Sequence, residues 1–122
     1  MTDENFDDRK ARASAWFRTL RDDIVAAFER LEDTQATGPF AQAPAGRFEV
    51  TETTRTSDDG SDAGGGLMSV MRGGRVFEKV GVNVSTVYGT LGEKAQAAMA
   101  ARGVPGMESD PRFWASGISL VA

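Results

Sequence analysis

Residues Gly64 to Ser85 constrain the fold of this 122-residue chain more than any other segment. The segment opens with three consecutive glycines and continues with two strand-like runs that are separated by Gly73-Gly74. Two adjacent residues that are free to adopt positive φ are typical of the tight type I′ turn of a β-hairpin. The sequence therefore predicts two antiparallel strands, Leu67–Arg72 and Arg75–Tyr88, joined at Gly73-Gly74.

In the second of these strands the side chains alternate between the two faces of a sheet. One face carries Val76, Val80, Val82 and Val84, and the other carries Phe77, Gly81, Asn83, Ser85 and Val87. The missing side chain of Gly81 leaves a gap, which fits a β-bulge, close helix packing, or a bulky neighbour or ligand. The polar side chains at strand positions are Asn83, Ser85, Tyr88 and Ser119. From spacing alone, each is either a hydrogen-bonded sheet residue or a group that orients the carboxylates of a ligand.

The remaining elements give the fold class. From Asp7 to Leu31, apolar residues recur at three- and four-residue spacing, which predicts an amphipathic helix. Its apolar stripe is Trp16, Phe17, Leu20, Ile24, Phe28 and Leu31, and its polar face is Arg12, Arg18, Arg21, Asp22, Glu29 and Arg30. We also expect strands at Arg47–Arg55 and Trp114–Ala122 and a short helix at Glu93–Arg102. The predicted fold is α+β, an antiparallel sheet packed by a long N-terminal helix and a short second helix, and an incomplete part of a larger helix-covered antiparallel sheet.

Composition removes several classes of function. The chain has no cysteine and no histidine, which excludes disulfides, thiol nucleophiles, histidine acid–base chemistry and the usual zinc or haem ligands within these residues. The formal net charge of -4 disfavours a nucleic-acid partner, because phosphate binding needs clustered Lys and Arg. The apolar runs are too short to cross a membrane. The acidic N-terminus does not resemble a signal peptide, so we expect a cytoplasmic protein.

Three local motifs suggest sites but lack the required context. The Gly64–Gly66 triplet could cradle a phosphate, but no helix and no Gly-Lys-Ser/Thr ending follows it. Arg72-Gly73-Gly74 resembles one RGG element of RNA-binding tails, and a turn between strands explains it better. Asp58, Asp59 and Asp62 resemble part of a calcium loop, without the Glu at its twelfth position or the flanking helices. We therefore interpret these acidic residues as a solvent-facing loop.

Two blocks of the sequence resemble the oxygen-dependent coproporphyrinogen III oxidase family. The first is Gly64–Gly89, with G-G-G, R-G-G, V-F-E-K and G-V-N-V-S elements, and the second is Phe113–Val121, with G-I-S-L-V. The resemblance implies oxidative decarboxylation of two propionate side chains of coproporphyrinogen III to vinyl groups, which yields protoporphyrinogen IX in haem and porphyrin biosynthesis. It implies O2 as co-substrate, no organic cofactor, a tetrapyrrole substrate and a homodimer. It leaves a divalent-metal requirement open and places no metal on this part of the chain.

The resemblance also assigns residues. By its position in the G-I-S motif, Ser119 corresponds to the substrate-contacting serine of the family. A segment implicated in dimer formation corresponds to Val76, Phe77, Glu78, Lys79, Val80, Gly81, Val82, Asn83, Val84 and Ser85. The proton-donating histidine and the Asn-x-Arg substrate clamp of the family are not among these 122 residues, so no catalytic residue is assigned.

These assignments lead to an expectation about the chain as a whole. We expect residues 1–122 to form one partial domain, the N-terminal part of a coproporphyrinogen oxidase domain, inactive by itself, with flexible segments at residues 1–6 and 56–64. An incomplete sheet exposes an edge, so the isolated chain should self-associate. The alternative is a non-catalytic binding or assembly module that reuses the helix and the hairpin.

Overall fold

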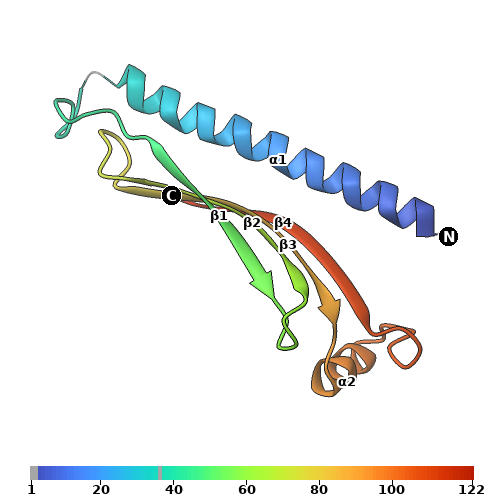
Figure 1. Ribbon diagram of the computed structural model, residues 1–122. Coiled ribbons are helices and arrows are strands. Elements are labelled where there is room, and N and C mark those ends of the chain that lie inside the picture. The colour runs from blue at the N-terminus through green and yellow to red at the C-terminus, as the bar shows by residue number, and fades with distance from the viewer. Residues whose placement is uncertain (1–2, 36) are drawn as a thin grey trace.

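A long helix lies across one face of a four-stranded antiparallel sheet in the computed structural model, which describes residues 3–35 and 37–122 (Figure 1). Neighbouring strands in the sheet are also neighbours in the sequence, in the order β1-β2-β3-β4. The α+β prediction is confirmed. The elements in chain order are α1 (Asp3–Thr34), β1 (Phe48–Thr56), β2 (Asp62–Arg72), β3 (Lys79–Thr90), α2 (Glu93–Ala101) and β4 (Arg112–Val121).

The core lies where the C-terminal half of α1 meets β2 and β3. Met71, Val80 and Val82 are fully buried there, against partly buried helix residues such as Ile24 and Phe28. The ring of Phe28 also meets that of Phe77 edge-on, with 4.7 Å between the centroids. Burying an aliphatic side chain of this size contributes roughly 1.5–3 kcal/mol, so this cluster fixes α1 on the sheet.

The buried stripe of α1 differs from the predicted one at two apolar positions. Trp16 is 57% exposed and Leu31 is 52% exposed, so both were wrongly assigned to the buried face. Two charged residues assigned to the solvent face, Arg21 and Glu29, are instead half-buried and contact the sheet. Arg21 donates from Nη2 to the buried Ser69 Oγ at 2.9 Å. A polar residue of the helix thus packs on the sheet because a polar group there binds it. The periodicity of apolar residues alone does not predict such a contact.

The β2–β3 connection is longer than the predicted two-residue turn. It runs from Gly73 to Glu78, and Gly73 alone of the glycine pair has a positive φ, of 64°. The N–H groups of Arg75 and Phe77 donate to the side chain of Glu32 on α1 rather than to β2, at 2.5 and 3.0 Å. Because these donors are already used, the strand ladder begins only at Lys79, and the predicted start at Arg75 was wrong.

The glycine triplet belongs to β2, which begins earlier than the predicted Leu67. A Cβ at Gly66 would lie 1.9 Å from the carbonyl oxygen of Val84, and such a contact is impossible without moving the backbone. These glycines therefore allow close strand approach, as glycine in a strand often does. Residues 1 and 2 of the predicted flexible terminus lie outside the described residues, and that residues 56–64 are flexible stays a prediction.

Candidate functional site

The face of the sheet opposite α1 carries Ser119, and we call it the open face because no element within residues 3–35 and 37–122 covers it (Figure 1). In the register of β3 and β4, Ser119 stands directly opposite Asn83. Ser119 is exposed and Asn83 is half-buried. The Oδ1 atom of Asn83 is buried and has no hydrogen-bond partner within the described part of the chain. Since buried amide oxygens are normally paired, this atom marks a place where a donor is missing.

The backbone beside this pair is bare. Gly81 precedes Asn83 by one same-face position, and Gly117 stands in the same relation to Ser119. A Cβ at Gly117 would meet no other described atom within 4 Å, and one at Gly81 would meet only the Asn83 amide nitrogen, at 3.9 Å. The gap predicted at Gly81 is therefore open space rather than close packing. A flat ligand could rest there, with one hydroxyl and one amide beside it to bind polar groups.

The segment predicted to mediate dimer formation divides into two parts. Val76 to Glu78 lie in the β2–β3 connection, where Val76 is 45% exposed. Lys79 to Ser85 lie in β3, where each residue pairs with β2 and only Gly81 to Ser85 also pair with β4. From Gly81 to Ser85 the strand therefore has no free backbone edge, and alternate side chains along it face α1. It can contact another molecule only through its open-face side chains.

The other polar residues noted in the sequence do not join Ser119 in one site. Ser85 lies on the open face, opposite Gly117, whereas Tyr88 has the opposite parity on β3. The Tyr88 hydroxyl donates to Asp62, and this bond lowers the pKa of Asp62 while raising that of the tyrosine.

The acidic loop makes local bonds. The carboxylate of Asp59 accepts from Ser61, at 2.9 Å from its N–H and 2.6 Å from its hydroxyl. Nowhere in residues 3–35 and 37–122 do three acidic side chains gather in a way that could hold a metal ion. In the acidic loop, the Asp59 carboxylate therefore stabilises the local turn.

A separate groove of about 1100 Å3 lies between the N-terminal turns of α1 and the ends of β3 and β4. Its walls include Phe6, Lys10, Tyr88 and Trp114, and the Lys10 ammonium stands 5.9 Å from the centre of the Trp114 ring. The groove is open, and neither Ser119 nor Asn83 lines it. This groove and the predicted substrate residue are therefore at different places on the fold.

Sequence reasoning missed Glu32, the only fully buried charged side chain of the described residues. Its carboxylate accepts backbone hydrogen bonds from two loops, including those of Gly46 and Val76, both at 2.8 Å. The signal was present, because Glu32 follows Phe28 by four residues and so continues the buried stripe of α1. A carboxylate on an apolar stripe indicates a polar partner within the core.

Comparisons with known proteins give the same family as the sequence motifs. Residues 12–122 match the family model described as coproporphyrinogen III oxidase, so the chain belongs to the coproporphyrinogen III oxidase family. A protein from Rickettsia bellii (strain RML369-C) named oxygen-dependent coproporphyrinogen-III oxidase is 44% identical over 109 residues, which cover 89% of this chain and 34% of the relative.

A second relative carries the same name. The oxygen-dependent coproporphyrinogen-III oxidase of Rickettsia felis is 41% identical over 115 residues, or 94% of this chain and 37% of the relative. The chain thus spans about a third of the length of the relatives that it matches. No solved structure matches it. None of the helices in the described part of the chain has the length and hydropathy needed to cross a membrane.

Proposed function

We propose that this chain serves an oxygen-dependent coproporphyrinogen III oxidase, which converts coproporphyrinogen III to protoporphyrinogen IX by oxidative decarboxylation of two propionates. The observation that carries the proposal is the family match over residues 12–122. Because the chain spans about a third of its relatives, the reaction belongs to a protein of the relatives' length. To that protein the chain contributes α1, the four strands and the substrate-facing Ser119.

On this proposal the open face receives the tetrapyrrole. The Ser119 hydroxyl and the Asn83 Nδ2 would donate to a propionate carboxylate, and the unpartnered Asn83 Oδ1 would accept from a pyrrole N–H. The bare backbone at Gly81 and Gly117 would leave room for the ring. In the reaction a base removes the pyrrole N–H proton, and O2 adds to the ring carbon as electron acceptor to form a hydroperoxide. Loss of a hydrogen from the propionate carbon next to the ring releases H2O2, and departure of CO2 leaves the vinyl group. We propose that no organic cofactor takes part. The role of Ser119 and Asn83 would be to hold the substrate, so the base must come from elsewhere.

The test is a chimera in which residues 12–122 replace the matching segment of the Rickettsia bellii relative. We expect the chimera to consume coproporphyrinogen III in an O2-dependent manner, measured by fluorescence after oxidation of the product. The 122-residue chain assayed alone should be inactive. A folded chimera with no turnover would refute the substrate proposal, and turnover by the chain alone would refute the assignment of the reactive groups to other residues.

Within the chimera, Ser119→Ala should lower kcat/KM about 10-fold or more, because a hydrogen bond to a charged group contributes roughly 1.5–3 kcal/mol. The matched control is Ser116→Ala on the same strand, since Ser116 has the opposite parity and bonds with Thr86 at 3.0 Å. That control should lower stability slightly and leave kcat/KM unchanged. Equal kinetic effects of the two substitutions would contradict a substrate role for Ser119.

We also propose that the protein is a homodimer in the cytoplasm, and two features support self-association. Both β1 and β4 are edge strands of the sheet, and Val76 exposes an apolar side chain in the β2–β3 connection. Val76→Arg should raise the monomer fraction in sedimentation equilibrium at least tenfold, whereas Val104→Arg, at an equally exposed valine outside the segment, should not. A chimera of the relatives' length that is a compact monomer at every concentration would refute the dimer.

A further inference from the structure

The carboxylate of Glu32 occupies a cradle of backbone donors from two separate loops. Gly46 donates to Oε1 at 2.8 Å and Arg75 to the same atom at 2.5 Å. Val76 and Phe77 donate to Oε2 at 2.8 and 3.0 Å. Both carboxylate oxygens are therefore satisfied by main-chain N–H groups. Successive N–H groups that converge in this way form a concave anion-binding site.

Two glycines give the cradle its shape. A Cβ at Gly74 would lie 2.5 Å from Glu32 Oε1, and one at Gly46 would lie 3.2 Å from it and 2.7 Å from Met71 Sδ. Gly74 is thus required because a side chain there would fill the space of the carboxylate, not because a tight turn needs its φ. A side chain at Gly74 would block the carboxylate, and one at Gly46 would crowd it.

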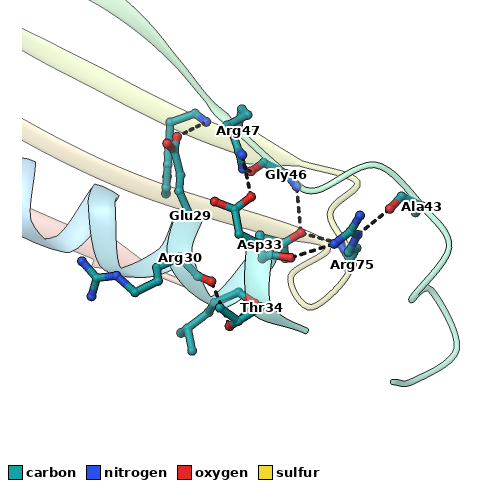
Figure 2. A network of polar contacts seen from close by, with 11 residues as sticks. Glu29, Arg30, Asp33, Thr34, Ala43, Gly46, Arg47 and Arg75 are labelled. Atoms are coloured by element: carbon teal, nitrogen blue, oxygen red, sulfur yellow. Dashed lines mark hydrogen bonds and ion pairs between the residues drawn. The ribbon is translucent and has the colours of Figure 1, made fainter. Parts of the chain in front are cut away.

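The cradle has supports that do not depend on the Glu32 side chain. Arg75 Nε donates to the carbonyl oxygen of Ala43 at 2.6 Å, which ties the β2–β3 connection to the loop before β1 (Figure 2). Inside the connection, the N–H of Gly73 donates to Glu78 O at 2.8 Å, and that of Gly74 donates to Phe77 O at 2.9 Å. These bonds keep the two loops together without Glu32, and its carboxylate then fixes the orientation of the N–H groups of Arg75–Phe77.

Electrostatics agree with an anion site. Burial opposes the charged form of Glu32, yet the four backbone N–H donors outweigh burial and lower the pKa of this carboxyl to about 2. The group is therefore a carboxylate at neutral pH, although it is fully buried. The four backbone donors thus supply the compensation that a buried charge requires.

We propose that the two loops form an internal carboxylate-binding site, and that Glu32 is its built-in ligand and the positioning residue for Arg75–Phe77. This inference goes beyond the proposed function, because the cradle neither touches the open face nor needs a substrate. Occupancy of the site determines where the first residues of the predicted dimer segment lie. Failure of the catalytic proposal would leave it unaffected.

The test exploits the size of the side chain that is removed. Glu32→Ala deletes a methylene and a carboxylate, which together have the heavy atoms of acetate, whereas Glu32→Gly deletes the heavy atoms of propionate. We expect each variant to have a Tm lower by roughly 10 °C. Acetate should raise the Tm of Glu32→Ala more than propionate does, with a dissociation constant of about 10 mM, and the order should reverse for Glu32→Gly.

The controls separate binding from a general salt effect. Sodium chloride at matched ionic strength should not restore either variant. Glu29→Ala removes a neighbouring carboxylate that accepts a single bond, from Phe48 N–H at 3.0 Å, and should show no dependence on either anion. If acetate and propionate act alike on both Glu32 variants, or act equally on Glu29→Ala, the binding site is refuted.

A measurement on the unmodified chain covers the case in which the Glu32 variants do not fold. Hydrogen exchange read by mass spectrometry should show the amides of Arg75, Val76 and Phe77 protected by at least 100-fold relative to that of Asp58, which lies in the exposed β1–β2 turn. Exchange at residues 75–77 as fast as at Asp58 would refute the cradle.

Discussion

The two faces of the four-stranded sheet differ in burial and in how their polar groups are satisfied. On the face under α1, Met71, Val80 and Val82 are fully buried, and the polar groups Ser69 and Glu32 have partners. On the open face, Ser119 is exposed, and the Oδ1 of Asn83 lacks a partner within the described residues. The covered face contributes the stability. The open face carries polar groups that the described residues leave exposed or unpaired.

This difference teaches where substitutions should affect stability and where they should affect function. Native structures tolerate an unsatisfied buried polar atom mainly where a ligand, water or another segment completes it. Stability therefore comes from positions where any change leaves a cavity, a clash or an unpaired group. Three predictions test this division between the two faces. The first tests whether the open face also contains a position at which the fold does not tolerate a substitution.

The largest effect is expected from Gly66→Ala, with Gly117→Ala as its matched control. Both glycines are paired in register with Ser85, one from β2 and one from β4. A Cβ at Gly66 would lie 1.9 Å from Val84 O, whereas one at Gly117 would meet no described atom within 4 Å. Gly66→Ala should cost about 4 kcal/mol or prevent folding, and Gly117→Ala should change the free energy of unfolding by less than about 1 kcal/mol. Urea denaturation followed by circular dichroism decides, and similar losses for the two would contradict the geometry.

The second effect is a loss of stability in acid that originates on the covered side. The folded-state pKa of Glu32 is lowered from 4.5 to about 2, so its contribution is complete above pH 4.5 and is lost as the pH falls toward 2. A shift of this size corresponds to about 3 kcal/mol. The measurement is the free energy of unfolding in urea between pH 6 and pH 2.

Other charged groups lie near Glu32, so the experiment needs a control that separates their contribution to the pH dependence from that of Glu32. Glu29 and Asp33 lie on the same end of α1, and Asp33 pairs with Arg47 at 2.5 Å (Figure 2). The guanidinium of Arg75 also reaches the Glu32 carbonyl oxygen, at 3.3 Å. Glu32→Gln keeps all of these groups, so it should remove only the part of the slope that belongs to Glu32. An unchanged acid slope in Glu32→Gln would assign the effect to its neighbours.

Much of the fold could be predicted because local patterns and global packing agree. The alternation along β3 placed Val80, Val82 and Val84 on one face, and that face is the buried one. Hairpin chemistry was less informative at Gly73-Gly74, because a long-range partner, Glu32, takes the N–H groups that a two-residue turn would leave to the ladder. No window of local sequence contains that interaction.

The candidate site divides in the same way. The G-I-S motif singled out Ser119, and strand parity predicted the shared face of Asn83 and Ser85. That Asn83 stands opposite Ser119 depends on the register between β3 and β4, which is fixed by the whole hairpin and the helix between them. The sequence could not show the unpartnered Oδ1 either, because hydrogen-bond partners are a property of the assembled sheet.

Asn83→Leu is expected to have the smallest effect on stability. It also gives the most direct test of the difference between the two faces, because stability and activity should change in opposite directions. An unpaired buried amide oxygen costs free energy, so an apolar side chain of similar size should raise the free energy of unfolding by about 0.5 kcal/mol. In the chimera the same substitution should lower kcat/KM about 10-fold, because it removes a donor to the substrate carboxylate. Opposite signs for stability and activity are typical of a functional position. A clear loss of stability with unchanged turnover would instead make Asn83 a structural residue and move the substrate site away from the open face.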